Sequence, residues 1–259
     1  MQNGCVYVNN QITTLHSFRL KAGDMVEINT QAGTLAKASL PFPVLYEDPN
    51  LIVIEKPAGI VTSSTDESTS VQWIITQFLK SQSKGKTRAY VVHRLDKEVS
   101  GIVLFAKSQF VMNFFKDHWK ETEKRYIALV EGAPEKPEGT IQSWLVEDKS
   151  QKVHSTGNSV NAKLAITHYK TIQLLDNYTL LEVKLETGRK NQIRVHLSDA
   201  GCPIVGDRKY GASTNYIRRI RLHACYLSFQ HPVNCKNIIV ESPMPKGFLK
   251  LREQDEKYK

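Results

Sequence analysis

The sequence lacks the features that mark several large classes of protein. It contains no run of about 18 apolar residues, so we expect no membrane-spanning helix. The N-terminus lacks the basic and then apolar pattern of a secretory signal. Four cysteines are present, and no pair has the close spacing of a zinc knuckle or a redox motif: Cys5, Cys202, Cys225 and Cys235. We therefore expect reduced thiols and a cytoplasmic location.

Motifs for bound cofactors are also missing. No glycine-rich phosphate loop of the nucleotide-binding types occurs, and Gly206-Asp207 is too short to count as one. His223 is of the kind that usually has a structural role, and no other segment supplies a convincing third metal ligand. We expect neither a cofactor nor a metal.

Acidic residues are absent from Arg208 to Val240, although the whole chain of 259 residues contains 26 of them. Six basic residues lie in that stretch, and the formal net charge of the chain is +9. Such a charge favours a polyanionic partner, either nucleic acid or an acidic membrane face. The alternative is a solvated basic face without a partner.

The chain divides into two segments of different character. Residues 1–38 resemble a small unit, with a hairpin around Asn9-Asn10 and a turn at residues 20–24. Small polar residues from Thr30 to Ser39 are typical of a linker. We expect a larger domain over residues 39–259, beginning near Pro41.

Hydrophobic periodicity in the larger domain predicts many strands and few helices. Helices are expected over residues 71–79, capped by Thr69 or Ser70, over 110–119, capped by Ser108, and near 192–199. Strands are expected over residues 51–54, 101–106, 126–130, 141–146, 164–172, 181–185, 220–229 and 238–240. This pattern predicts an α+β fold with a largely antiparallel sheet.

Three stretches contain residues that could carry out chemistry. His93-Arg94-Leu95-Asp96 lies between two apolar segments, where a loop often holds functional groups, although Asp96 could equally cap a turn. Arg189 and Lys190 lie where a helix is expected to begin, which suits an anion site.

Arg194 lies within the same predicted helix and needs a partner, usually a carboxylate. The alternative is a surface cluster with a structural salt bridge. The third stretch, residues 221–224, is more typical of an ordinary strand, and Tyr126 of a core or edge position.

Together and in this order, these stretches resemble the RluA family of RNA pseudouridine synthases. The resemblance covers roughly residues 41–245 and lies in the segments 55–59, 93–101, 124–130, 187–197, 206–207 and 222–224. It implies a mixed, mostly antiparallel sheet with a central active-site cleft. It also implies an isomerase that converts uridine to pseudouridine without a cofactor.

The resemblance assigns roles to single residues. Asp96 matches the catalytic aspartate, and Arg194 matches the arginine that pairs with it. Arg94 matches the arginine that contacts RNA at the flipped nucleotide. Tyr126 matches the tyrosine that packs on the target base, and Leu222 an apolar residue of the base pocket. We count further residues as substrate-binding candidates: Lys56, His93, Arg189 and Lys190.

Some features depart from the family pattern. Val99 stands where the family commonly has Thr, and Asn191 where it commonly has His, so we expect effects on local packing or substrate choice. Residues 1–38 resemble only the second half of the RNA-binding domain named after ribosomal small-subunit protein four. They are expected to form a partial RNA-binding unit.

The sequence thus predicts a monomeric enzyme that modifies structured RNA, with large-subunit ribosomal RNA favoured over transfer RNA. Two other functions stay open. One is a non-catalytic RNA-binding protein that kept the fold. The other is a hydrolase that uses His93 and Asp96, although no nucleophile or second carboxylate is obvious nearby.

Overall fold

The computed structural model describes residues 6–8, 11–12, 20–28, 40–64, 70–214 and 219–250. Contacts within the chain divide it into two compact units, Met1–Ser39 and Leu40–Lys259. The predicted Asn9-Asn10 turn and the linker of residues 30–39 lie outside the described residues. The two units are described separately below.

The first unit contains a small antiparallel sheet with strand order β2-β1-β3. Its strands are β1 (Val6–Val8), β2 (Gln11–Ile12) and β3 (Val26–Ile28). The predicted turn precedes β3, where the Asp24 amide donates to the Lys21 carbonyl at 3.1 Å. The Lys21 amide in turn donates to the Asp24 carboxylate at 2.8 Å, so this turn is closed from both sides.

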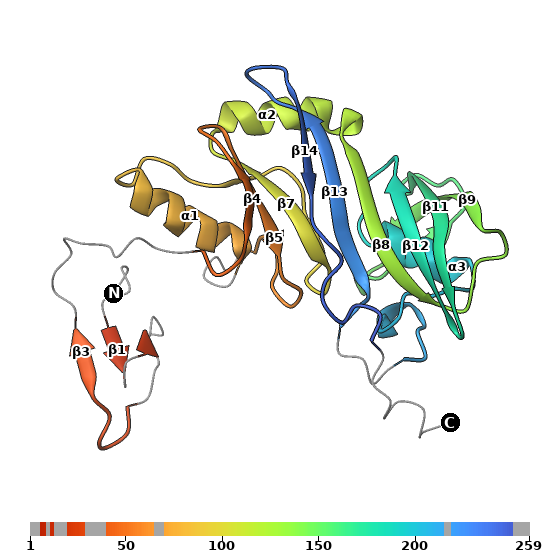
Figure 1. The fold of residues 1–259 in the computed structure, drawn as a ribbon, viewed down its shortest axis with the longest axis horizontal. Coiled ribbons are helices and arrows are strands. Elements are labelled where there is room, and N and C mark those ends of the chain that lie inside the picture. Colours follow the sequence, from red (N-terminus) through yellow and green to blue (C-terminus); the bar gives the residue numbers. More distant parts are fainter. Residues whose placement is uncertain are drawn as a thin grey trace. The chain divides into compact units, whose positions relative to one another are not determined.

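The second unit is built on one large sheet (Figure 1). Its main order is β10-β9-β11-β12-β8-β13-β7-β5-β4, with β14 paired to β13 and β6 paired to β7. The described strand pairs are antiparallel except for β13 with β7. The strands are β4 (Val44–Glu47), β5 (Leu51–Lys56), β6 (Tyr90–Val91), β7 (Ser100–Ala106), β8 (Glu123–Glu131), β9 (Glu138–Glu147), β10 (Val153–Thr156), β11 (Lys163–Leu175), β12 (Tyr178–Leu185), β13 (Leu222–Gln230) and β14 (Asn237–Glu241). The predicted α+β fold with a mostly antiparallel sheet is confirmed.

The helices begin where the sequence predicted them. Ser70 caps α1 (Val71–Gln82) and Ser108 caps α2 (Gln109–His118), each hydroxyl accepting from a backbone amide of the first turn. The third helix is α3 (Gln192–Asp199), and short 3-10 turns form η2 (Trp119–Glu121) and η3 (Arg208–Tyr210). Within the described residues, none of the helices has the length and apolarity needed to span a bilayer.

Strand β7 is buried because helices cover both faces of the sheet around it. Its side chains alternate between two hydrophobic clusters. Val103 and Phe105 belong to a cluster with residues of α1 and α3, whereas Ile102 and Leu104 belong to a cluster with residues of α2. The apolar run at residues 101–106 is therefore a central strand.

The parallel contact between β7 and β13 requires a glycine. Gly101 has a φ of +119°, and a Cβ atom there would lie 2.2 Å from the carbonyl oxygen of Ala224. Only glycine allows the two backbones to approach this closely. The approach places the loop of residues 92–99, which precedes β7, beside the start of β13 at the centre of the sheet.

Candidate active site

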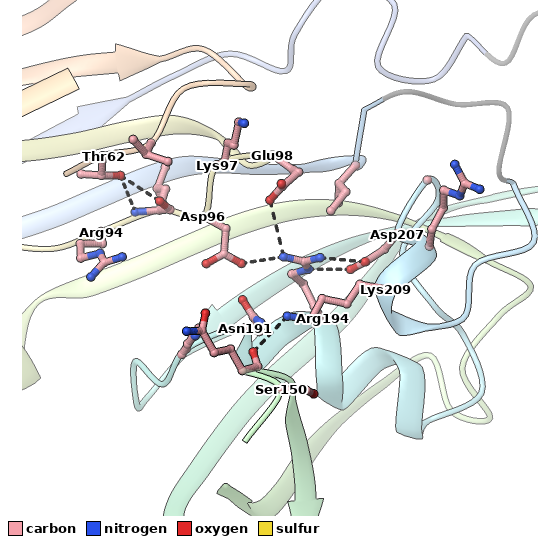
Figure 2. Close-up of a pocket in the computed structure, with 17 residues that line it drawn as sticks. Thr62, Arg94, Asp96, Lys97, Glu98, Ser150, Asn191, Arg194, Asp207 and Lys209 are labelled. Carbon is pink, nitrogen blue, oxygen red and sulfur yellow. Dashed lines mark hydrogen bonds and ion pairs between the residues drawn. The ribbon is translucent and has the colours of Figure 1, made fainter. Parts of the chain in front are cut away.

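Asp96 lies in the 92–99 loop, which is hydrogen-bonded to the segment after β5. The Thr62 hydroxyl donates to the Leu95 carbonyl at 2.8 Å and accepts from the Leu95 amide at 3.1 Å (Figure 2). The Gly59 amide donates to the Lys97 carbonyl at 2.7 Å. These bonds hold the backbone on both sides of Asp96, so the position of its carboxylate is set by the fold.

Lys56 has a structural role in holding this loop. Its assignment as a substrate-binding residue is therefore corrected. Its side chain is fully buried, and its ammonium donates to the carbonyls of Pro57, Ile60 and Lys97 at 2.8–3.3 Å. Burial lowers the pKa of Lys56 to about 8. The ammonium is thus occupied by backbone and has no exposed surface for a ligand.

Arg194 makes the contact with Asp96 that the sequence led us to expect. From α3, its Nη1 atom donates to Oδ2 of Asp96 at 2.9 Å. On its other side, Nε and Nη2 donate to the two carboxylate oxygens of Asp207 at 2.6 and 2.8 Å (Figure 2). Burial opposes the charged guanidinium, but the bonds and charge of Asp207, and then of Asp96, raise the pKa of Arg194. It is therefore a fixed positive charge beside Asp96.

Asp207 is a residue that our reading of the sequence missed. Residues 206–207 carry part of the family resemblance, but Asp207 was assigned no role of its own. Asp207 is 1% exposed and accepts hydrogen bonds from Arg194 with both carboxylate oxygens. The ring of Tyr210 lies 5.0 Å from the Arg194 guanidinium carbon. A buried arginine beside a reactive carboxylate needs a second carboxylate that stays charged. This requirement could have identified Asp207 from the sequence.

Asn191 also contacts Asp96, although the sequence suggested only packing or substrate effects there. One end of its amide lies 2.8 Å from the Tyr210 hydroxyl, which can donate or accept, and the other end faces the carboxylate of Asp96. Because a carboxylate only accepts, the end that faces Asp96 is assigned as the nitrogen and the other end as the oxygen. The nitrogen then donates to Oδ2 at 2.7 Å and lies 3.2 Å from Oδ1. The carboxylate is thus bound from two directions, by Arg194 and by Asn191.

Asp96 borders a small hollow, in which half of the lining residues are apolar or aromatic; we call it the apolar hollow after that part of its wall. Tyr126 of β8 and Leu222 of β13 line it together with Asp96, as the resemblance implied, and both side chains are buried. Burial, with the charge of Asp96 as a second cause, raises the pKa of Tyr126 above its usual range. The phenol therefore stays neutral and presents a flat, uncharged face to the hollow.

Asp96 also lines a basic cleft of about 850 Å³ (Figure 2). Six of its lining residues are basic and three are acidic. Arg94 lines both the cleft and the hollow, is exposed, and makes no hydrogen bond or ion pair with the described residues. A carboxylate placed between a basic cleft and an apolar hollow suits a ligand that has anionic groups and a flat, uncharged ring.

Comparison with known proteins identifies the family. The sequence model of the RNA pseudouridylate synthase family matches residues 50–199, more than half of the chain. The chain belongs to that family. An uncharacterized RNA pseudouridine synthase of Bacillus subtilis, YhcT, is 33% identical over 97% of this chain and 85% of its own length. The ribosomal large subunit pseudouridine synthase C of Rickettsia bellii is 36% identical over 83% of this chain.

A solved structure shows the same fold. Human RNA pseudouridylate synthase domain containing 4 aligns with a TM-score of 0.68 at 24% identity, covering 80% of this chain and 90% of that one. These findings confirm the resemblance to the RluA type within residues 40–259 and the fold class. The chain is therefore an RNA pseudouridine synthase, an isomerase that acts on RNA.

Within this synthase, the other basic candidates lie around the site. Lys190 lines the cleft and forms an ion pair with Glu147. Arg189 is exposed beside the apolar hollow, where its Nε atom donates to the Leu164 carbonyl at 3.0 Å. Both side chains keep donors that face solvent, in agreement with an anion site at the start of α3.

His93 does not line the cleft or the hollow, which corrects its assignment as substrate-binding. Its ring stacks on Trp119 at 4.7 Å between centroids, and Nε2 accepts from the Leu104 amide at 3.1 Å. Burial and then the charge of Lys124 lower the pKa of His93 to about 3. The ring is therefore a neutral acceptor that joins the loop to η2 and β7.

A buried polar chain crosses the centre of the sheet near the site. His223 is fully buried, with the Ser100 hydroxyl 2.8 Å from one ring nitrogen and the Ser242 hydroxyl 3.0 Å from the other. Ser100 also accepts from Arg219 at 2.6 Å. Burial lowers the pKa of His223 to about 4, so the ring is neutral near pH 7. The structural role expected for this histidine agrees with these contacts.

Proposed function

We propose that this synthase converts uridine to pseudouridine in large-subunit ribosomal RNA, with Asp96 as its catalytic carboxylate. The observation that supports the role of Asp96 is its place between the basic cleft and the apolar hollow, held by the buried Arg194. A uridine within a stem must leave the stack to be modified. Its base would enter the hollow while the flanking phosphates lie in the cleft.

The reaction accounts for the need for a charged carboxylate. The bond between ribose C1′ and uracil N1 breaks, the uracil turns, and C1′ joins C5. The proton on C5 then leaves to solvent, and N1 takes up a proton, so no electrons are gained or lost. Asp96 can act as a nucleophile at the ribose–base junction or as a base that removes a ribose proton. Either role needs the ionised form, which Arg194 favours.

The remaining residues hold the substrate in this proposal. Tyr126 packs on the uracil and Leu222 closes the hollow around it, which limits escape of the detached base. Arg94 lines both pockets with Asp96 and would contact the RNA at the flipped nucleotide. Arg189 and Lys190 contact phosphates further along the strand.

Ribosomal RNA is favoured by two relatives that are named as ribosomal large-subunit synthases. These are the large-subunit synthase C of Rickettsia bellii and the large-subunit synthase D of Borreliella burgdorferi, which is 34% identical over 76% of this chain. We further propose that residues 1–38 form a partial RNA-binding unit and that the protein acts as a monomer in the cytoplasm. Sedimentation of the full chain, alone and with RNA, would test the monomer.

The test uses RNA transcribed with uridine tritiated at C5, because the reaction releases that tritium to water. Wild type and Asp96→Asn are incubated separately with large-subunit ribosomal RNA and with transfer RNA. The proposal expects release from ribosomal RNA by wild type alone, with RNA affinity retained in Asp96→Asn. Tritium release only from transfer RNA would assign transfer RNA, and not ribosomal RNA, as the substrate. Tight binding without release from either RNA would favour a binding protein that kept the fold.

A further inference from the structure

The carboxylate of Asp96 has a second donor that comes from a different direction than the arginine. Arg194 reaches Oδ2 from within α3. The Asn191 nitrogen reaches the same oxygen at 2.7 Å and lies 3.2 Å from Oδ1. A single contact leaves a carboxylate free to turn about its Cβ–Cγ bond. Two donors from separate directions fix that rotation.

The backbone places Asn191 in this position at low cost. Asn191 precedes the first turn of α3 with φ of 54° and ψ of 17°, a left-handed conformation that asparagine and glycine adopt more readily than other residues. The side chain is 8% exposed, so its amide does not exchange partners with water freely. The residue can thus point a short, polar side chain at Asp96 without helical strain.

Tyr210 holds the amide from behind. Its hydroxyl lies 2.8 Å from the amide oxygen of Asn191. The Tyr210 side chain is itself buried, and its carbonyl accepts from the Ser198 hydroxyl at 2.7 Å. The position of the phenol is therefore set by the core, and it holds one end of the amide. The carboxylate of Asp96, which only accepts, requires the nitrogen at the other end.

We propose that Asn191 is a positioning residue for Asp96: its amide donates to the reacting carboxylate and fixes its rotation, and Tyr210 fixes the amide. The proposal rests on the proposed role of Asp96. An amide donates at every pH, so this contact does not depend on the protonation of Asn191.

Two substitutions separate positioning from packing. Asn191→Gly suits the left-handed backbone and removes the donor. Asn191→Asp keeps the shape and the acceptor for Tyr210 but points an acceptor at Asp96. Positioning predicts that kcat falls roughly 10- to 100-fold in Asn191→Gly and further in Asn191→Asp, with KM for RNA nearly unchanged. A packing role predicts the opposite order, with the isosteric Asn191→Asp closer to wild type, and that order would overturn the proposal.

A second measurement does not depend on turnover. Side-chain amides of asparagine are labelled with ¹⁵N, and the Asn191 signal is assigned by its loss in Asn191→Gly. Asp96→Ala should move this signal upfield and speed its exchange with water, while an unchanged signal would contradict the contact. If the signal moves but wild type releases no tritium, the contact stands and the proposed reaction fails.

Cys235→Gly, at an exposed left-handed position with φ of 56°, is the matched control for Asn191→Gly and should leave kcat unchanged.

Discussion

The substitution Asp207→Asn tests whether the ion pair with Asp207 fixes the position of Arg194. Asp207→Asn keeps the shape of the side chain but removes the charge that receives two of the three short bonds from Arg194. Breaking a buried ion pair by removing one partner costs about 3–5 kcal/mol. In Asp207→Asn the amide oxygen can still accept one hydrogen bond from Arg194, and Arg194 is still paired with Asp96. We therefore expect a smaller loss, of about 2–3 kcal/mol, in the free energy of unfolding.

The same substitution should also slow the reaction. With Asp207 neutral, Arg194 is drawn toward Asp96 and its guanidinium leaves the orientation that two fixed bonds imposed. We expect kcat to fall by about 10- to 100-fold, because a displacement of about 1 Å in a positioning group has effects of that size.

Urea denaturation measures the stability and tritium release measures kcat. Glu182→Gln is the control, because the 3.8 Å ion pair of Glu182 with Arg125 is exposed and should contribute under about 1 kcal/mol. If Asp207→Asn matched Glu182→Gln in both measurements, the account of Arg194 would be refuted.

Three further predictions concern the centre of the sheet. Gly101→Ala should lose at least about 3 kcal/mol of unfolding free energy in urea or fail to fold, because its Cβ would lie 2.2 Å from a backbone oxygen; stability within about 1 kcal/mol of wild type would contradict this. Since the folded-state pKa of His223, about 4, lies below its unfolded value, stability is lost as pH falls. Between pH 6.5 and 5, wild type should lose about 1.6 kcal/mol more of its unfolding free energy than His223→Gln, and equal losses would contradict the assignment. Tyr126→Phe should retain more tritium release than Tyr126→Leu, because only the aromatic face is needed for stacking; the reverse order would assign a role to the hydroxyl.

Local signals in the sequence were sufficient for most of the fold. The sequence predicted Ser108, and either Thr69 or Ser70, as helix caps, because a hydroxyl before an amphipathic run commonly caps a helix; the caps are Ser70 and Ser108. The parallel pairing of β7 with β13 was not foreseen. It depends on a close approach between Gly101 and Ala224, which are distant in the chain, and no local pattern encodes such a contact.

The candidate site was predicted only in part, for a similar reason. Arg194 could be paired with Asp96 because a buried charge demands a partner and the ordered motifs supplied one. Lys56 and His93 were placed among substrate-binding residues because they lie in segments that carry the family resemblance, yet both side chains turn inward to backbone groups. Asn191 contributes through a left-handed backbone angle, which an amino-acid sequence does not display.

The central claim is that Asp96 carries out the isomerisation. The most direct measurement digests ribosomal RNA to nucleosides after incubation with wild type or Asp96→Asn and separates pseudouridine, uridine and free uracil by chromatography. The account predicts pseudouridine from wild type, no free uracil, and neither product from Asp96→Asn. Pseudouridine formed by Asp96→Asn at the wild-type rate would contradict it, and free uracil without pseudouridine would show a hydrolase instead.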